Sequence, residues 1–446
     1  MATFPPISHA ASSDRPSLQY KKVMASGLMN ASASRTHPPL IHHLAICPEA
    51  QHIAGGFGHE VVIWQIDLDP DSGGYGAQDY QEKWDILTIC HLNQLQGVGD
   101  FYVTCLTWAS KKYFLFGSSS GEVFKLDKIN RWKVGCDWKR FKPSTHAIKF
   151  LAMNRDGLLA VACGDHNVAI WVYDECSEDE DEEARWDCIH RLPLPSSRIG
   201  DGALYEVTYL GWNEALPDIL VVSYLNHGIL SWNASLGQWG EPFEVDKVYA
   251  GALSPDGRLY AAPGTRGAFD VFDLESKIRF RTLRDPEPVR NELPREKARP
   301  CQFVHDGEFL LGADIGRINL WHIATATRLQ HLDLNLIGAD QGYVDRPIGA
   351  FAISDTNNVQ HNQIIRVAAC SKGPYQDVEV WKAKVHSLAV QEEGRTAGAR
   401  VQEEERTAGA GVQEEERTAG ARVPVELICL ILLGSLVMNG WMYTSI

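Results

Sequence analysis

Gly164-Asp-His-Asn-Val-Ala-Ile-Trp171 is a turn followed by an apolar run that closes on an aromatic side chain. Two further stretches, Gly267-Ala-Phe-Asp-Val-Phe272 and Gly316-Arg-Ile-Asn-Leu-Trp321, repeat this pattern. An apolar or alternating run behind a glycine-marked turn is typical of a buried β-strand. Seven runs of this kind occur along the chain, and they close on Trp64, Phe124, Trp171, Trp232, Phe272, Trp321 and Trp381.

Three copies of the repeat also carry an Asp-Gly turn, at Asp156-Gly157, Asp256-Gly257 and Asp306-Gly307. From that glycine to the closing aromatic residue is 14, 15 and 14 residues. A recurring unit of strand, Asp-Gly turn, strand, short turn and strand, roughly 40–60 residues long, is typical of a propeller blade. Because one blade cannot bury both of its faces, the blades must close into a ring. The repeats therefore predict an all-β fold, a seven-bladed β-propeller.

The repeats resemble those of WD40-repeat proteins over roughly residues 41–384. Gly164–Trp171 is similar to the closing strand of that family, with Asp165 at the usual turn position. Most of the family's Gly-His and Trp-Asp dipeptides are missing: Gly58-His59 lies in a different turn, and Phe272-Asp273 is the nearest match to the second dipeptide. The resemblance implies a WD40-like propeller in which the family's buried Asp–His–Ser/Thr–Trp network is mostly absent.

The predicted propeller spans residues 18–384 and is flanked by segments of different character. Residues 1–17 are expected to be disordered. Residues 18–24 are expected to add an edge strand that completes the last blade and so hides two sheet edges. Residues 385–424 contain three near copies of an 11-residue repeat, each with an interior glycine. We expect this segment to be a flexible, low-complexity spacer.

An apolar segment follows at residues 425–443, in which Ser435 and Asn439 are the polar side chains from residue 427 onward. As a helix its 17-residue core would span about 26 Å, slightly less than the roughly 30 Å of a hydrocarbon core. We expect a single C-terminal transmembrane helix that anchors a cytoplasmic propeller to an intracellular membrane. The alternative is a soluble cytoplasmic protein.

Composition argues against several classes of function. The net charge of −15 opposes a general affinity for nucleic acid, which requires clustered Lys and Arg. The ten cysteines include no Cys-x-x-Cys pair, so we expect no zinc site. His-Glu-x-x-His and phosphate-binding Gly-x-x-x-x-Gly-Lys motifs are also missing. We therefore expect no metal, no cofactor and no enzymatic activity.

Two kinds of stretch are candidates for contact with a protein partner. Trp138-Lys-Arg-Phe-Lys142 interleaves cations with aromatic rings, a pattern found where acidic peptides or phosphates bind. We place it in a loop between the second and third blades; packing of its aromatic residues is the alternative. His166 and His227 occupy turns before closing strands, which in a propeller open on the face where partners dock. The candidate partner-binding residues are Trp138, Lys139, Arg140, Phe141, Lys142, His166 and His227.

The function we expect is that of a non-catalytic scaffold that binds proteins, as the WD40 resemblance implies; the sequence names no partner. One alternative is a chaperone or binder of basic proteins, which would use residues 174–183, where eight of ten residues are acidic. A second alternative is an enzyme with a site in the central channel. The predicted innermost strands, such as Leu44-Ala-Ile-Cys47, are apolar and leave few groups for acid–base chemistry.

Overall fold

The structure is a computed structural model in which the described residues all belong to the propeller. They are residues 20–24, 41–48, 51–67, 83–91, 101–109, 113–127, 138–174, 185–195, 205–264, 267–285, 299–314, 316–334, 348–356, 363–371 and 378–385.

Contacts divide the chain into two units, Met1–Ser387 and Leu388–Ile446. The expected disordered segment 1–17, the spacer beyond Val385 and the apolar segment 425–443 lie outside the described residues. Within the described ranges, no helix has the length and hydropathy needed to span a membrane.

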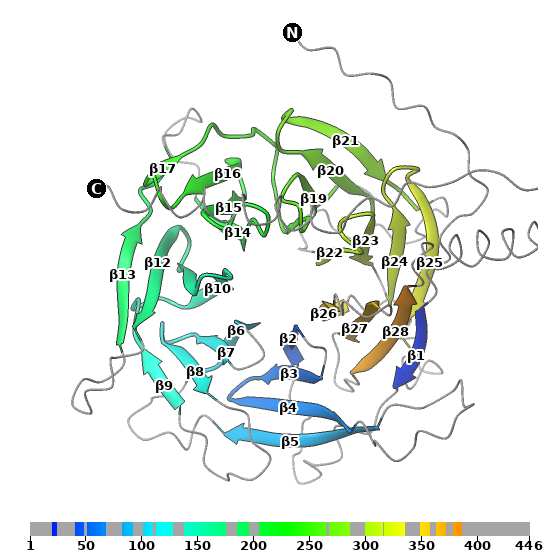
Figure 1. Ribbon diagram of the computed structural model, residues 1–446, viewed down its shortest axis with the longest axis horizontal. Helices are drawn as coiled ribbons and strands as arrows, with labels where there is room; N and C mark the ends of the chain where they lie inside the picture. The colour runs from blue at the N-terminus through cyan, green and yellow to red at the C-terminus, as the bar shows by residue number, and fades with distance from the viewer. Residues whose placement is uncertain are drawn as a thin grey trace, which may run out of the picture. The chain divides into compact units, whose positions relative to one another are not determined.

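The described strands form seven four-stranded antiparallel sheets arranged as blades around a ring (Figure 1). The first strand of each blade is innermost and the fourth lies at the perimeter. Blade 1 contains β2 (Ile41–Ile46), β3 (His52–Phe57), β4 (Glu60–Asp67) and β5 (Lys83–His91). Blade 2 contains β6 (Val103–Trp108), β7 (Tyr113–Ser118), β8 (Val123–Asp127) and β9 (Trp138–Phe141). Blade 3 contains β10 (Ile148–Met153), β11 (Leu158–Cys163), β12 (Asn167–Asp174) and β13 (Arg185–Arg191).

The second half of the ring repeats the same order. Blade 4 contains β14 (Val207–Trp212), β15 (Ile219–Tyr224), β16 (Gly228–Asn233) and β17 (Gln238–Trp239). Blade 5 contains β18 (Ala252–Leu253), β19 (Leu259–Pro263), β20 (Phe269–Asp273) and β21 (Ile278–Leu283). Blade 6 contains β22 (Cys301–Val304), β23 (Phe309–Ala313), β24 (Arg317–His322) and β25 (Thr327–Asp333). Blade 7 contains β26 (Ile348–Thr356), β27 (Gln363–Ser371), β28 (Glu379–Val385) and β1 (Tyr20–Met24).

The predicted fold is confirmed, and each of the seven closing aromatic residues lies on the third strand of a blade. All seven side chains are buried, from Phe124 and Trp321, which are fully enclosed, to Trp171, which is 9% exposed. The sequence revealed the repeat because the third strand of a blade packs against both neighbouring blades. Burial therefore restricts its residue types more than those of the other strands.

The turns between first and second strands explain the Asp-Gly dipeptides. Gly157, Gly257 and Gly307 have φ angles of 85°, 70° and 88°, a region that favours glycine. The residue that follows the first strand caps several of these turns: Asn154 Oδ1, for example, accepts the amide N–H groups of Asp156 and Leu158 at 3.0 and 2.8 Å. Local side-chain acceptors and left-handed glycines together fix these turns.

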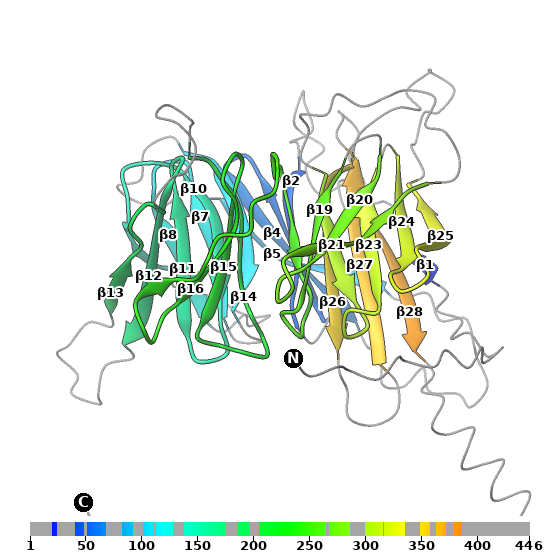
Figure 2. The ribbon, with the colours of Figure 1, turned by 90° about the horizontal axis from the view of Figure 1, so that it is seen from above.

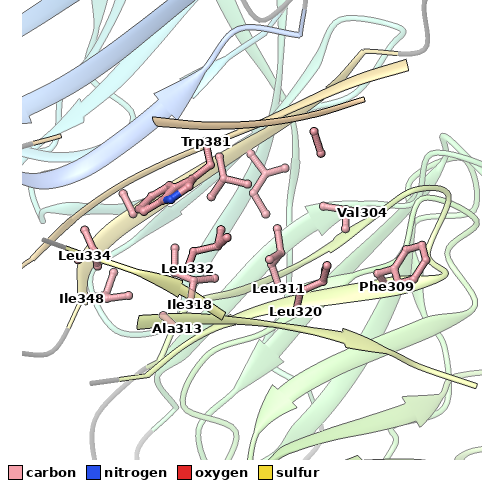
Figure 3. Close-up of a cluster of buried hydrophobic side chains, with 14 residues drawn as sticks. Val304, Phe309, Leu311, Ala313, Ile318, Leu320, Leu332, Leu334, Ile348 and Trp381 are labelled. Atoms are coloured by element: carbon pink, nitrogen blue, oxygen red, sulfur yellow. The ribbon is translucent and has the colours of Figure 1, made fainter. Parts of the chain in front are cut away.

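The hydrophobic core lies between blades. At the boundary of blades 6 and 7, Ile318 and Leu320 project from one face of β24 and cluster with Trp381 of β28 and with Ile348 of β26 (Figure 3). Each such aliphatic side chain, fully removed from water, stabilises the fold by about 1.5–3 kcal/mol. A blade is therefore stable only because the next blade covers it.

The ring closes through a strand from the other end of the chain. β1 pairs antiparallel with β28, with Lys22 opposite Trp381, and completes blade 7. The innermost strands β26 and β2 also contact each other. The prediction that an N-terminal strand completes the last blade is confirmed by this pairing.

The indole N–H groups of Trp64, Trp171, Trp232 and Trp321 have no hydrogen-bond partner among the described residues. A buried donor without a partner costs about 1–3 kcal/mol. Among the described residues, these four indoles thus take no part in the tryptophan-centred network whose dipeptides are mostly missing from the sequence.

Candidate functional site

The strands run between two faces of the ring, which Figure 2 shows from its edge. The upper face carries the turns between second and third strands and the segments that enter first strands. The two kinds of segment are joined by hydrogen bonds: the N–H of Val103 donates to Gly58 O, and that of Val207 donates to Asp165 O, both at 2.8 Å. The lower face carries the turns between first and second strands and between third and fourth strands.

The prediction that Trp138–Lys142 forms a loop is wrong, because Trp138–Phe141 is β9, the outer strand of blade 2. β9 pairs with β8, with Phe141 opposite Val123 and Trp138 opposite Leu126. Side chains alternate along a strand, so Phe141 and Lys139 share one face and Arg140 lies on the other.

Phe141 packs against blade 3. Its ring is stacked on Trp186, with centroids 4.8 Å apart and planes 19° apart, and lies 5.2 Å from the ring of Trp171. Phe141 is half-buried. Its main role is to join two blades, the packing alternative noted for the aromatic residues of this stretch.

The cations of this stretch remain in contact with water. Lys139, Arg140 and Lys142 are exposed. Lys139 Nζ donates a hydrogen bond to the hydroxyl of Tyr173 at 2.9 Å, so its position is fixed by blade 3. Arg140 lies 4.0 Å from Glu122, a distance at which an exposed ion pair contributes little. Arg140, in β9, and Lys142, which follows it, are therefore the cations of this stretch that are most available to a partner.

The segment after β9 leads to His146, which sequence reasoning missed. His146 is exposed and lies against Gly164, where an added Cβ atom would come within 3.2 Å of the His146 Cβ atom. Gly164 also has a φ of 59°, so this close approach depends on glycine. Two residues further on, His166 is exposed on the same upper-face turn. We call Arg140, Lys142, His146 and His166 the basic strip.

Beside the basic strip, Lys149 joins blades 3 and 4. Its Nζ atom lies 3.1 Å from a carboxylate oxygen of Asp165 and 3.1 Å from one of Glu206. Burial opposes the charged form, but the hydrogen bonds to these two carboxylates outweigh it and raise the pKa of Lys149. Lys149 therefore stays protonated and partly neutralises the acidic groups next to His166.

His227 does not belong to the exposed strip, because its side chain is 9% exposed. The ring is stacked on Tyr205, with centroids 3.9 Å apart and planes 18° apart, and meets the edge of Tyr224. Neither ring nitrogen has a hydrogen-bond partner among the described residues. Burial lowers the pKa of His227. The structure thus places His166 on the turn of Gly164, which His146 contacts, but encloses His227 in blade 4.

One sequence pattern associated with catalysis was also missed. Gly117-Ser-Ser-Ser-Gly121 matches Gly-x-Ser-x-Gly, which in hydrolases places a serine on a strand-to-helix turn. Here it joins two strands, β7 and β8. Ser119 Oγ accepts the N–H of Tyr102 at 3.0 Å, and the N–H of Ser119 donates to Tyr102 O at 2.9 Å. The serine is a turn residue in a setting unlike a nucleophile elbow.

Three cysteine thiols in the described part of the chain are enclosed. Burial raises the pKa of Cys105 to about 12, of Cys163 to about 11 and of Cys301 to about 12. These thiols are protonated at neutral pH and are poor nucleophiles and metal ligands. The described residues contain no group of three or more His, Cys, Asp or Glu side chains placed to hold a metal ion.

The acidic run begins at Asp174, the last residue of β12, and β13 starts at Arg185. β12 ends and β13 begins on the lower face of blade 3. Residues 175–184 lie outside the described residues.

No family model matches the chain, and no curated protein matches it. Its fold is therefore established by the seven sheets and their order around the ring.

We predict that His227→Phe will make folding less sensitive to acid. Because the folded-state pKa of His227 is lowered, the unfolded chain takes up the proton more readily, and the free energy of unfolding should fall as pH drops below the ordinary histidine value of 6.5. Phenylalanine keeps the stack on Tyr205 and cannot be protonated. Chemical unfolding between about pH 8 and pH 5 measures the effect.

His166→Phe is the matched control, since it replaces an exposed imidazole by the same side chain. Equal acid dependence in the wild type and both variants would contradict the assignment of a buried, unpartnered imidazole at position 227.

Proposed function

We propose that the chain is a non-catalytic protein-interaction scaffold of the WD40 type, and that its basic strip binds an acidic segment of a partner protein. The repeat pattern resembles that of WD40 proteins, a family that mostly assembles complexes. Fold alone does not establish function, so the proposal depends on the chemistry of the surface.

The observation that carries the proposal is the exposure of Arg140 and Lys142 at the boundary of blades 2 and 3. The chain as a whole has a net charge of −15, so a local group of cations departs from its general balance. At physiological ionic strength, repulsion between the remaining negative charge of the chain and an acidic segment is screened beyond about 8 Å. Close contacts between that segment and the basic strip are screened much less.

A protein partner fits this surface better than nucleic acid does. Nucleic-acid binding rests on many Lys and Arg contacts to successive phosphates. The basic strip has two permanent cations and two histidines, and Glu122 lies 4.0 Å from one of the cations. A short acidic peptide needs only a few such contacts.

We predict that Arg140→Glu combined with Lys142→Glu will weaken binding of a fluorescent deca-glutamate peptide by about tenfold. Each reversal exchanges an attraction of about 0.5–1 kcal/mol for a repulsion, and a tenfold change corresponds to about 1.4 kcal/mol. Lys139 is left unchanged because it also contacts Tyr173. Fluorescence anisotropy at two salt concentrations measures the affinity.

Arg279→Glu combined with Arg281→Glu provides the matched control, since both arginines are exposed on β21, the outer strand of blade 5. It makes the same change in net charge and should leave the affinity nearly unchanged. Equal weakening by both double variants would show that only overall charge matters. Tighter binding of an oligouridine than of the peptide would favour a nucleic-acid ligand.

The proposal extends to a membrane tether formed by residues 425–443, with the propeller on the cytoplasmic side. Leu, Ile and Val each favour insertion by about 0.3–0.6 kcal/mol at a helix centre, enough to offset Asn439. We predict that carbonate extraction will leave the full-length chain in the membrane fraction and release a chain ending at Lys384. Equal release of both would make the protein a soluble propeller.

A further inference from the structure

Two leucines on the lower face of blade 4 are unusually exposed. Leu216, in the turn between β14 and β15, is 59% exposed, and Leu236, in the turn between β16 and β17, is 69% exposed. Single exposed apolar residues are common on soluble proteins. Two on adjacent turns of one blade call for a physical explanation, because neither contributes much to the core.

The two turns are held in place and joined to each other. The Asn213 side chain accepts the N–H of Leu216 at 3.0 Å, and that of Asn233 accepts the N–H of Leu236 at 2.8 Å. Asp218 links the turns: its backbone carbonyl accepts the N–H of Ala234 at 2.8 Å. Both leucines are therefore presented on fixed backbone, which lowers the entropy lost when a partner covers them.

The first of these turns is also tied to blade 3. Asn154 Nδ2 donates to Pro217 O at 3.1 Å, and the guanidinium of Arg155 lies 2.9 Å from the Glu214 carboxylate. The leucines thus lie on a surface that spans two blades and keeps its shape.

Acidic groups predominate around the leucines. Asp156, Glu214 and Asp218 are exposed on the turns between the first and second strands of blades 3 and 4, and the cation in these two turns is Arg155. These four side chains together carry a net charge of −2. An anionic lipid surface or a nucleic acid would be repelled, whereas a basic segment with apolar side chains would complement both the charge and the leucines.

We propose that the lower face of blade 4 binds a basic amphipathic segment of a partner protein. Two apolar side chains of that segment cover Leu216 and Leu236, and its Lys or Arg side chains reach Glu214 and Asp218. The leucines act as central anchors and the carboxylates form the polar rim. This surface is separate from the basic strip and takes a ligand of opposite charge.

The probe for this surface is a 14-residue amphipathic helical peptide made of leucine and lysine. We expect Leu216→Ser combined with Leu236→Ser to weaken its binding at least tenfold in calorimetric titration, with no change in thermal unfolding. Ile278→Ser combined with Leu329→Ser is the matched control, because these side chains are 57% and 40% exposed on the outer strands of blades 5 and 6.

Three results would overturn the proposal. The leucine variant could bind the peptide as tightly as the control variant does. A peptide of the same composition, scrambled so that its leucines no longer share one helix face, could bind as well as the amphipathic one, which would leave charge as the only cause. Sedimentation velocity could show a dimer that the leucine variant alone abolishes, which would make a second copy of this chain the occupant.

Discussion

The pairing of β1 with β28 is the interaction on which the rest of the structure depends. Each blade covers its apolar faces only with its neighbours, as the cluster of Ile318, Leu320 and Trp381 between blades 6 and 7 shows. A ring has no end blade, so no face is left open once it closes. The closing strand comes from residues 20–24, which precede blade 1 in the chain but complete blade 7 in space. The two ends of the propeller therefore stabilise each other, and edges that would otherwise attract other strands are hidden.

Closure also fixes the positions of surfaces that no single blade contains. The innermost strands are joined near the lower face, where the indole N–H of Trp108 donates to Ala45 O at 3.2 Å and that of Trp212 donates to Ala152 O at 3.0 Å. Farther out, Phe141 of blade 2 stacks on Trp186 of blade 3. The basic strip combines a strand of blade 2 with a turn of blade 3. The lower-face surface around Leu216 and Leu236 combines turns of blades 3 and 4. Both keep their geometry because neighbouring blades cannot move independently.

The sequence predicted the features that recur from blade to blade. It missed the features that depend on contacts with residues elsewhere in the chain. The closing aromatic residues and the Asp-Gly turns were predicted correctly, because the same buried strand recurs in each blade and the same turn, with a glycine at positive φ, recurs in three of them. β9 was predicted to be a loop because its cations obscure the alternation of a four-residue strand, in which Phe141 stacks on Trp186 of the next blade. His227 looked like an exposed turn residue, yet Tyr205, which precedes the first strand of the same blade, covers its ring. His146 belongs to no motif, and only the contact with Gly164 shows that it lies against the turn that carries His166.

The most direct test of ring closure compares a chain that begins at residue 18 with one that begins at residue 26. The first retains β1 and the second lacks it, while blades 1 to 6 are identical in both. Closure by β1 predicts that the longer chain melts like the full-length protein. It also predicts that the shorter chain melts several degrees lower, because the open sheet edge of β28 and the boundary of blades 7 and 1 are weakened, and that β28 amides lose protection from hydrogen exchange. Equal melting temperatures and an equally protected β28 would contradict the account.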